Sequence, residues 1–367
     1  MSGVIIPDKL PIATINNFRK SVLTWYDKNR RVLPWRALPG DKPDPYHVWL
    51  SEVMLQQTVV ATVIPYFLKF LQSWPAVKDM ANAEQEDVLH AWAGLGYYAR
   101  ARNLHKCAQK ISTEFSGIFP QTETELKSLP GIGDYTAAAI LSIAFDKPSV
   151  VIDGNVERVM TRFFGITEPL PASKPQIRQA AALLAAERTD RPSDYAQALM
   201  DLGATVCIPK TPRCSLCPLQ RNCQGKKMGI AADLPAKRAK KAKPFKKGYV
   251  YWLRLEKTDE IMLERRAETG LFGGMAAFPT SEWLEKGKID HPAHILKWGT
   301  PTKLKGRVVR HSFTHFDLEL QGYEVILGKK PRLPGLLWTQ PGSLEKSGLP
   351  SLFQKFARIM MNNNNGR

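Results

Sequence analysis

The stretch LPGIGDYTAAAILSIAF, residues 129–145, decides the fold of the longer part of this chain. A proline and two glycines, Gly131 and Gly133, separate two segments with helical spacing, which predicts a helix–hairpin–helix unit over about residues 122–146. Glycine tolerates positive φ, so a tight hairpin fits here. The uncovered backbone N–H groups of the hairpin, together with the N-terminus of the next helix, would point toward an anion. A plain helix–helix turn has the same composition, so the stretch alone leaves both interpretations open.

The residues on both sides of this hairpin show helical spacing, from about residue 12 to residue 219, and strand alternation is nearly absent there. An all-α domain is therefore expected over residues 1–225. The following segment, residues 226–247, contains nine Lys and Arg, one Asp and two prolines without apolar periodicity. Such a composition is typical of a basic linker.

A second domain is expected over residues 248–357, because its apolar residues alternate with the two-residue period of strands. The alternation is clearest in YVYWLRLE, residues 249–256, and in RVVRHSFTHFDLELQGYEVIL, residues 307–327. Glycine-rich and proline-containing turns interrupt it, which predicts a mixed α+β domain. The asparagine-rich tail, residues 358–367, is of low complexity and is expected to be disordered.

The composition limits both the class of protein and the class of partner. The chain has 367 residues, 44% of them hydrophobic and 23% charged, as in globular proteins of two domains. No apolar run reaches the roughly 18 to 20 residues that a membrane span needs, and the first residues lack the features of a secretion signal. A net charge of +18 favours a polyanionic partner, and nucleic acid fits better than a membrane surface.

Four cysteines, Cys207, Cys214, Cys217 and Cys223, lie close together with gaps of six, two and five residues. Thiols this close can converge on one metal centre, and a cytosolic setting disfavours the alternative of two disulfides. The spacing does not choose between zinc and an iron–sulfur cluster, because the zinc-ribbon pattern needs two C-x2-C pairs and only one is present. The fifth cysteine, Cys107, is expected to be a small buried apolar residue.

Glu52 lies in a segment with strong apolar character. Helical spacing places it on one face with Val48, Leu55, Gln56, Val59 and Val63. Apolar neighbours disfavour the charged carboxylate, so the pKa of Glu52 is expected to rise, which suits a general acid. The alternative is a glutamate at the edge of a solvated face.

Asp153 follows the apolar run Val150-Val151-Ile152 and precedes a new helix. Its simplest role is that of an N-cap, which aspartate fills well. A carboxylate fixed there, opposite a second carboxylate, is also able to stabilise an oxocarbenium ion while an N-glycosidic bond breaks.

Taken together, LPGIG, the aspartate of VIDGNVERV and the cysteine spacing resemble the helix–hairpin–helix DNA glycosylases that carry a [4Fe–4S] cluster. Further segments are similar to the MutY-type adenine DNA glycosylases: PWR at 34–36, WLSEVMLQQT at 49–58, GLGYYARARNLHK at 94–106 and QALMDLGATVC at 197–207. The resemblance covers about residues 12–225 and, more loosely, the second domain.

This resemblance implies a monofunctional glycosylase of base excision repair that removes adenine mispaired with 8-oxoguanine or guanine. Glu52 would protonate the adenine ring and then activate water, and Asp153 would support the deoxyribosyl cation or a transient covalent adduct. The four cysteines would hold a [4Fe–4S] cluster in the loop 207–223, beside the DNA-binding helices and apart from the chemistry.

The resemblance also implies contacts with DNA. Gln57 and Tyr97 would enter the base stack and hold the opened duplex, as base flipping requires. Arg36 and Gln197 would contact the extruded adenine. For Tyr97 and the neighbouring Tyr98, core packing is the alternative, and we expect it to hold for one of the two.

Tyr135 separates this family from a near relative. The endonuclease III branch has a lysine at this position, whose amine forms a Schiff base and permits strand cleavage. Tyrosine does not form one, so the resemblance implies base removal without strand cleavage, with Tyr135 close to Asp153 and assisting it. An ordinary helix-surface aromatic is the alternative.

The second domain resembles a Nudix (MutT-like) fold, with GLFGGMAAFP, residues 270–279, as its glycine-rich segment. SEWLEKGKID, residues 281–290, offers too few acids for the Mg²⁺ site of a Nudix hydrolase, so hydrolysis is not expected. In the family a Phe-Ser-His loop recognises 8-oxoguanine. Phe313, Thr314 and His315 match this loop here. Threonine keeps the hydroxyl and adds a methyl group. Without the resemblance, the histidines of this stretch would be exposed strand residues.

The expected partner is double-stranded DNA with a mispaired adenine, with no membrane partner, and the protein is expected to act as a monomer in the cytoplasm, at the nucleoid of a bacterium. Two other functions remain open: an endonuclease III-like glycosylase and abasic-site lyase, and a non-catalytic iron–sulfur sensor of DNA damage. The sensor would not need Glu52 and Asp153 together.

Overall fold

The computed structural model describes residues 6–185, 190–238, 242–267 and 270–362. The chain divides into two compact units, and each is described by itself. The helical unit comprises Met1–Asn82 and Lys106–Lys240, and the sheet unit comprises Ala83–His105 and Lys241–Arg367.

The division differs from the expected boundaries at one segment. Ala83–His105 was expected in the all-α domain, but it groups with the C-terminal residues. Contacts within the sheet unit join the segment to these residues: for example, Arg102 Nη1 donates to the Gly273 carbonyl at 2.6 Å, and the Tyr97 hydroxyl lies 2.8 Å from Thr314 Oγ1.

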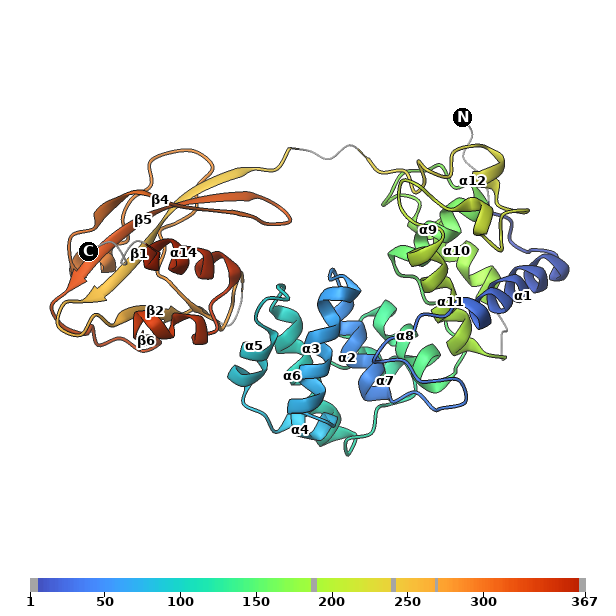
Figure 1. Ribbon diagram of the computed structural model, residues 1–367, viewed down its shortest axis with the longest axis horizontal. Helices are drawn as coiled ribbons and strands as arrows, with labels where there is room; N and C mark the ends of the chain where they lie inside the picture. The colour runs from blue at the N-terminus through green and yellow to red at the C-terminus, as the bar shows by residue number, and fades with distance from the viewer. Residues whose placement is uncertain (1–5, 186–189, 239–241, 268–269, 363–367) are drawn as a thin grey trace. The chain divides into compact units, whose positions relative to one another are not determined.

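The helical unit is built from short helices, as its periodicity predicts (Figure 1). They are α1 (Ile12–Asn29), α2 (Pro45–Leu55), α3 (Val60–Ser73), α4 (Val77–Ala81), the greater part of α6 (Ala99–Glu114), α7 (Glu123–Lys127), α8 (Asp134–Phe145), α9 (Gly154–Phe164), α10 (Lys174–Ala185), α11 (Pro192–Thr205), η1 (Cys214–Leu216) and α12 (Gln224–Lys227). Helix α5 (Gln85–Trp92) belongs to the sheet unit.

Two helices form the centre of the helical unit. Helix α11 packs against α1, α8 and α9, and α2 packs against α8. Helix α2 is apolar on almost every side, and Trp49, Leu50 and Met54 are fully buried in it. It begins at Pro45, after the N-cap Asp44, whose carboxylate accepts from the Tyr46 N–H at 2.8 Å. A helix buried all round places any polar residue it carries inside the unit.

The hairpin between α7 and α8 has the predicted place, with one difference in detail. Gly131 has a φ of +78°, in the left-handed region that glycine adopts without strain. Gly133 has a φ of −100° and serves as the extended N-cap of α8, so only one of the two glycines needs positive φ.

The helix that carries Glu52 is shorter than the spacing suggested. It ends at Leu55, and Gln57 adopts a left-handed conformation with φ +59° before α3 begins at Val60. The expectation of one continuous helical face from Val48 to Val63 is therefore wrong, because this turn breaks the helix.

In the part of the sheet unit that the structure describes there are six strands: β1 (Phe245–Leu255), β2 (Ile261–Arg265), β3 (Ala276–Ala277), β4 (Thr302–Ser312), β5 (Asp317–Leu327) and β6 (Leu336–Thr339). Their order is β3-β2-β1-β5-β4, with β6 paired to β2. Strands β1 and β5 run parallel in the centre, with Val250 opposite Gly322, and the other pairs are antiparallel.

Alternate residues of β1 face the two sides of the sheet, as strand geometry requires. Val250 and Trp252 pack with α14 (Ser351–Met361), which lies against the sheet in Figure 1. Tyr251 and Leu253 pack on the other face with Ile295 of α13 (Ala293–Trp298). The mixed α+β domain predicted from the alternation is therefore present.

Parts of the expected linker and tail are structured. Leu234 is buried, and its carbonyl accepts from Arg162 Nε at 2.9 Å, while Phe245 begins β1, so ordered structure enters the segment 226–247 from both ends. Helix α14 continues to Met361, so the tail begins later than residue 358. Residues 239–241 and 363–367 lie outside the described residues. No helix among the described residues is long and apolar enough to cross a bilayer.

Candidate functional site

The helical cavity is a space of about 780 Å³ in the helical unit. Its lining includes side chains from α2, α8 and α11, from the N-terminus of α9 and from the loop after α1. Five of the residues that sequence reasoning selected lie around it: Glu52, Tyr135, Asp153, Arg36 and Gln197. Gln57 lies at its rim, exposed to solvent. The fold thus brings together residues that are far apart in the chain.

Glu52 is the buried acid of the helical cavity, with only 6% of its surface exposed. The Tyr135 hydroxyl donates a hydrogen bond to Glu52 Oε2 at 2.5 Å. The pKa of Glu52 is raised to about 7, and burial is the main cause. The hydrogen bond from Tyr135 and the charge of Arg36 act to lower this pKa, and the negative charge of Asp153 acts to raise it. A carboxyl group with this pKa is able both to donate and to accept a proton near neutral pH.

Tyr135 lies in the first turn of α8, directly after the hairpin. Burial, followed by the charges of Glu52 and Asp153, raises the pKa of its hydroxyl well above 10, so the hydroxyl stays protonated and acts as a donor. We expected Tyr135 to assist Asp153, but its hydrogen bond goes to Glu52.

Asp153 is the N-cap of α9, as its position predicts. Its Oδ1 accepts from the Asn155 N–H at 2.9 Å and the Val156 N–H at 2.7 Å, and its Oδ2 accepts from Asn155 Nδ2 at 2.7 Å. These donors and the positive end of the helix dipole stabilise negative charge on this carboxylate. The two carboxyl groups of the cavity therefore differ: Glu52 is buried and accepts from the Tyr135 hydroxyl, whereas Asp153 is held by N–H donors.

A chain of polar contacts leads from Asp153 to the cysteine loop. Arg158 Nη2 donates to Asn155 Oδ1 at 2.9 Å and to the Gly203 carbonyl at 2.6 Å, and Arg158 Nε donates to the Cys207 carbonyl at 2.6 Å. Sequence reasoning missed Asn155 and Arg158. The two residues follow the N-cap of a helix and are three residues apart, which puts both side chains on one face. This spacing is the sequence signal by which they could have been found.

Gln197 and Arg36 lie at the side of the cavity formed by α11 and the loop after α1. Gln197 is 7% exposed, and its Nε2 donates to Ser193 Oγ at 3.1 Å. Arg36 is paired with Asp201, a buried residue that sequence reasoning also missed.

The residues expected to enter the base stack are exposed. Gln57 is exposed at a left-handed turn in the helical unit. In the sheet unit, Tyr97 is 48% exposed with φ +49°, whereas Tyr98 is 6% exposed. The expectation that one tyrosine of this pair packs in the core is confirmed for Tyr98.

The four cysteines line one small cavity together with Arg162. They form no disulfide. Burial is the main cause that raises the pKa of Cys217 to about 12; a hydrogen bond from the Leu219 backbone acts to lower this pKa, and the charges of the other three thiolates act to raise it. Arg162 Nη1 donates to Cys207 Sγ at 3.3 Å. Among the described residues, no three Cys, His, Asp or Glu side chains are close enough to hold a single metal ion. Cys107 is fully buried, as expected for an apolar cysteine.

The loop Phe313-Thr314-His315 joins β4 to β5 in the sheet unit. The Phe313 ring stacks on Trp283, with centroids 6.2 Å apart, and Lys243 Nζ donates to the Phe313 carbonyl at 2.7 Å. Thr314 and His315 are exposed. Residues 281–290, which would carry the acids of a Nudix hydrolase, form no helix.

Comparisons with known proteins agree with this architecture. Residues 50–187 match the HhH-GPD superfamily base excision DNA repair protein family, and residues 250–358 match the NUDIX domain. Adenine DNA glycosylase from Homo sapiens is 35% identical over 95% of this chain and 74% of that protein. The enzyme of the same name from Buchnera aphidicola subsp. Schizaphis graminum is 33% identical over 94% of this chain and 99% of that protein.

Solved structures show the same fold in the helical part. A thermostable thymine-DNA glycosylase superposes with a TM-score of 0.52 at 27% identity, over 59% of this chain and 98% of that one. A trapped covalent complex of endonuclease III with DNA superposes with a TM-score of 0.50 at 21% identity, over 60% of this chain and 99% of that one, a likeness of fold alone. From its sequence relatives, its family matches and its fold, the chain belongs to the adenine DNA glycosylases, enzymes of base excision repair that hydrolyse the N-glycosyl bond of adenine in DNA.

Proposed function

We propose that this enzyme removes adenine mispaired with 8-oxoguanine or guanine, and that it leaves the DNA strand intact. The observation that carries the proposal is the hydrogen bond from Tyr135 to Glu52, in a cavity that also holds Asp153. A protonated acid and a separate carboxylate are the two groups that acid-catalysed cleavage of an N-glycosidic bond requires.

In the first step Glu52 donates its proton to a ring nitrogen of the flipped adenine. Its pKa of about 7 leaves a substantial fraction protonated at neutral pH, and burial is the main cause. Tyr135 holds one carboxyl oxygen of Glu52 and thereby orients the other toward the base. The bond between the deoxyribose carbon and the base nitrogen then breaks, and its electrons leave with the protonated adenine.

In the second step Asp153 stabilises the positive charge that develops on the sugar. Its three N–H partners keep the carboxylate fixed, so little reorganisation accompanies the reaction. Glu52, now ionised, accepts a proton from water as the hydroxide adds to the sugar carbon. The products are adenine and an abasic site, and Glu52 regains its proton.

The absence of strand cleavage is supported by the composition of the helical cavity. Arginines line it, but no lysine does so among the described residues. The sequence resemblance implies that Tyr135 stands where the endonuclease III branch has its lysine. Schiff-base formation needs an unprotonated amine next to the sugar. The same observation disfavours the lyase alternative.

We also propose that Cys207, Cys214, Cys217 and Cys223 hold a [4Fe–4S] cluster. The donor set fits, because four partly buried thiols around one cavity need a positive centre to balance their charges as thiolates. A cluster distributes its four cysteines over four irons, so it does not require three of them around a single ion. The cluster would shape the loop that carries Lys210 and Arg213 toward DNA phosphate, and it supplies no step of the hydrolysis.

The proposed DNA contacts involve both units. Gly131 and Gly133 are exposed before the N-terminus of α8 and suit a phosphate, and Gln57 and Tyr97 would hold the opened base stack. The exposed Thr314 hydroxyl would read 8-oxoguanine from a loop held by the stacking of Phe313.

Arg36 and Gln197 would contact the extruded adenine, since both line the helical cavity. His315 would complete the loop that reads 8-oxoguanine. We further propose that the enzyme acts as a monomer on nucleoid DNA in a bacterial cytoplasm, and size-exclusion chromatography with light scattering tests the monomer.

A single-turnover assay tests the proposal. The duplexes carry adenine opposite 8-oxoguanine, guanine or thymine, with thymine glycol as a further control. We expect rapid release of adenine opposite 8-oxoguanine, slower release opposite guanine, none opposite thymine, and strand breaks only after alkali. Strand cleavage without alkali, or excision of thymine glycol, would instead support the lyase alternative.

A further inference from the structure

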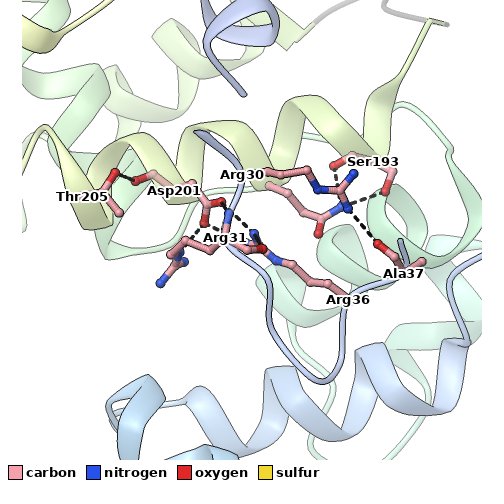
Figure 2. A network of polar contacts seen from close by, with 8 residues as sticks. Arg30, Arg31, Arg36, Ala37, Ser193, Asp201 and Thr205 are labelled. Atoms are coloured by element: carbon pink, nitrogen blue, oxygen red, sulfur yellow. Dashed lines mark hydrogen bonds and ion pairs between the residues drawn. The ribbon is translucent and has the colours of Figure 1, made fainter. Parts of the chain in front are cut away.

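A buried carboxylate outside the helical cavity holds the arginine that lines it. Asp201, on α11, has a fully buried side chain and is not among the described residues that line the cavity. Its Oδ2 accepts from Arg36 Nη1 at 2.7 Å, and its Oδ1 accepts from Arg36 Nη2 at 2.8 Å (Figure 2). Two parallel hydrogen bonds fix the plane of a guanidinium as well as the position of its charge.

The same carboxylate also binds the chain around Arg31. Asp201 Oδ2 accepts from the Arg31 N–H at 3.0 Å, and Oδ1 accepts from Arg31 Nε at 2.6 Å. Arg36 Nη1 donates in addition to the Arg31 carbonyl at 3.2 Å, and Arg30 Nη2 donates to the Ala37 carbonyl at 2.7 Å. The loop between α1 and α2 is therefore tied to α11 through one side chain (Figure 2).

Arg36 is held on one side and remains available on the other. Its side chain is 7% exposed and lines the helical cavity. The side-chain hydrogen bonds of Arg36 to the described residues are all made by Nη1 and Nη2, so its Nε–H keeps its capacity to donate. The acceptors that a purine offers are its ring nitrogens.

Helix α11 contributes to the cavity in two ways. Gln197 lines the cavity directly, and Asp201 follows it by four residues, which places both side chains on one face of the helix. One helix thus carries a group for the base and, one turn later, the group that holds Arg36.

We infer that Asp201 is a positioning residue, which holds Arg36 in the orientation in which its guanidinium contacts the flipped adenine. The inference rests on the proposed function, because that function makes the cavity the site of the base. Without the carboxylate, Arg36 regains rotamers and loses its counter-charge. A displacement of about 1 Å in such a contact lowers a rate by about 100-fold.

A double-mutant cycle tests the inference, with Asp201→Asn, Arg36→Met and the double variant in single-turnover adenine release. If Asp201 acts through Arg36, each single substitution lowers the rate of adenine release by about 100-fold. The rate of the double variant should then lie within about threefold of the rate of the slower single variant. Two results would overturn the inference. One is a rate in the double variant about 10,000-fold below that of the unaltered protein, which would mean that the two substitutions act independently. The other is a rate in Asp201→Asn within threefold of that of the unaltered protein.

The pH dependence gives a second readout, which a purely structural role would not change. The charged and titratable groups around Glu52 are Tyr135, Asp153 and Arg36. Asp201→Asn leaves the charge of Arg36 uncompensated, so the decline of the rate at high pH should move to lower pH. The decline should not move in this way in the double variant, because it lacks Arg36. An unmoved profile in Asp201→Asn would contradict positioning through Arg36.

A matched control separates positioning from loss of stability. Leu184→Ala removes a fully buried side chain on α10 that does not line the cavity, and it should lower the melting temperature while leaving the rate unchanged. All variants are assayed below their melting transitions, as judged by circular dichroism. A rate loss in Leu184→Ala equal to that of Asp201→Asn would overturn the inference. Adenine release by the unaltered protein tests the proposed function separately.

Discussion

The helical cavity and the loop Phe313-Thr314-His315 hold their polar groups in opposite ways. Glu52 in the cavity and Asp201 behind it are both buried, and each has defined hydrogen-bond partners. In the loop, Thr314 is exposed, its Oγ1 lies 2.8 Å from the hydroxyl of the exposed Tyr97, and the neighbouring ring of Phe313 stacks on Trp283. On the proposed function, the two regions therefore have different roles. Burial in the helical unit sets the pKa of the proton donor, and the exposed Thr314 hydroxyl in the sheet unit contributes to the choice between 8-oxoguanine and guanine. Changes in the cavity should therefore act on rate, and changes in the loop on discrimination.

The largest effect is expected from Glu52→Gln. Glutamine keeps the shape but has no proton to donate, so adenine release should fall by at least about 1,000-fold, within the range of general acid catalysis. Binding of a mispaired duplex, measured by fluorescence anisotropy, should stay within about threefold of the unaltered protein. Turnover at a tenth of the original rate would refute the role of Glu52.

The next effect concerns the cysteine loop. Cys217→Ser removes one thiolate of the proposed cluster and should lower both the iron content and the broad near-visible absorption of the purified protein. Because Arg158 links the Cys207 carbonyl to Asn155, we expect the loss to lower DNA affinity and adenine release together, by about tenfold or more. Cys107→Ser, at a buried position away from the loop, is the control and should retain the iron. Equal iron in both variants would count against the cluster.

A smaller effect is expected from Tyr135→Phe. The change removes the donor to Glu52, and because that hydrogen bond lowers the pKa of Glu52, the pKa should rise and the high-pH decline of the rate should move to higher pH. The maximal rate should fall by about tenfold, since the orientation of the carboxyl group is lost. Single-turnover rates over a series of pH values measure both. A decline that moves to lower pH would mean that Tyr135 does not stabilise the ionised carboxylate.

The smallest effect is expected in the sheet unit. Thr314→Ala removes the exposed hydroxyl, which should reduce the preference for adenine opposite 8-oxoguanine over adenine opposite guanine by about tenfold, the worth of one hydrogen bond. The rate opposite guanine should not change. Thr314→Ser keeps the hydroxyl and should preserve the preference. If both variants lose it equally, the methyl group rather than the hydroxyl is responsible.

Local patterns in the sequence predicted much of the fold and part of the site. The hairpin, the N-cap Asp153 and the four cysteines depend on spacing within a few residues, and each lies where the spacing indicates. The change from helical to strand periodicity likewise predicted the α+β character of the C-terminal part.

The remaining features depend on pairs that are distant in the chain. The partner of Tyr135 lies 83 residues away, and Asp201 lies 165 residues from Arg36, so no periodicity reveals either pair. The end of α2 at Leu55 depends on the left-handed Gln57, a conformation that local preference does not favour. Tertiary packing decides such features.

The pH dependence of single-turnover adenine release tests the central claim most directly, namely that burial makes Glu52 the acid. Since the protonated form is the active one and its pKa is about 7, the rate should be high below pH 7 and fall about tenfold per pH unit above it. The assay uses adenine opposite 8-oxoguanine with enzyme in excess, and binding is verified at each pH. A rate that stays constant from pH 6 to about pH 9, with the duplex bound throughout, would contradict Glu52 as the proton donor.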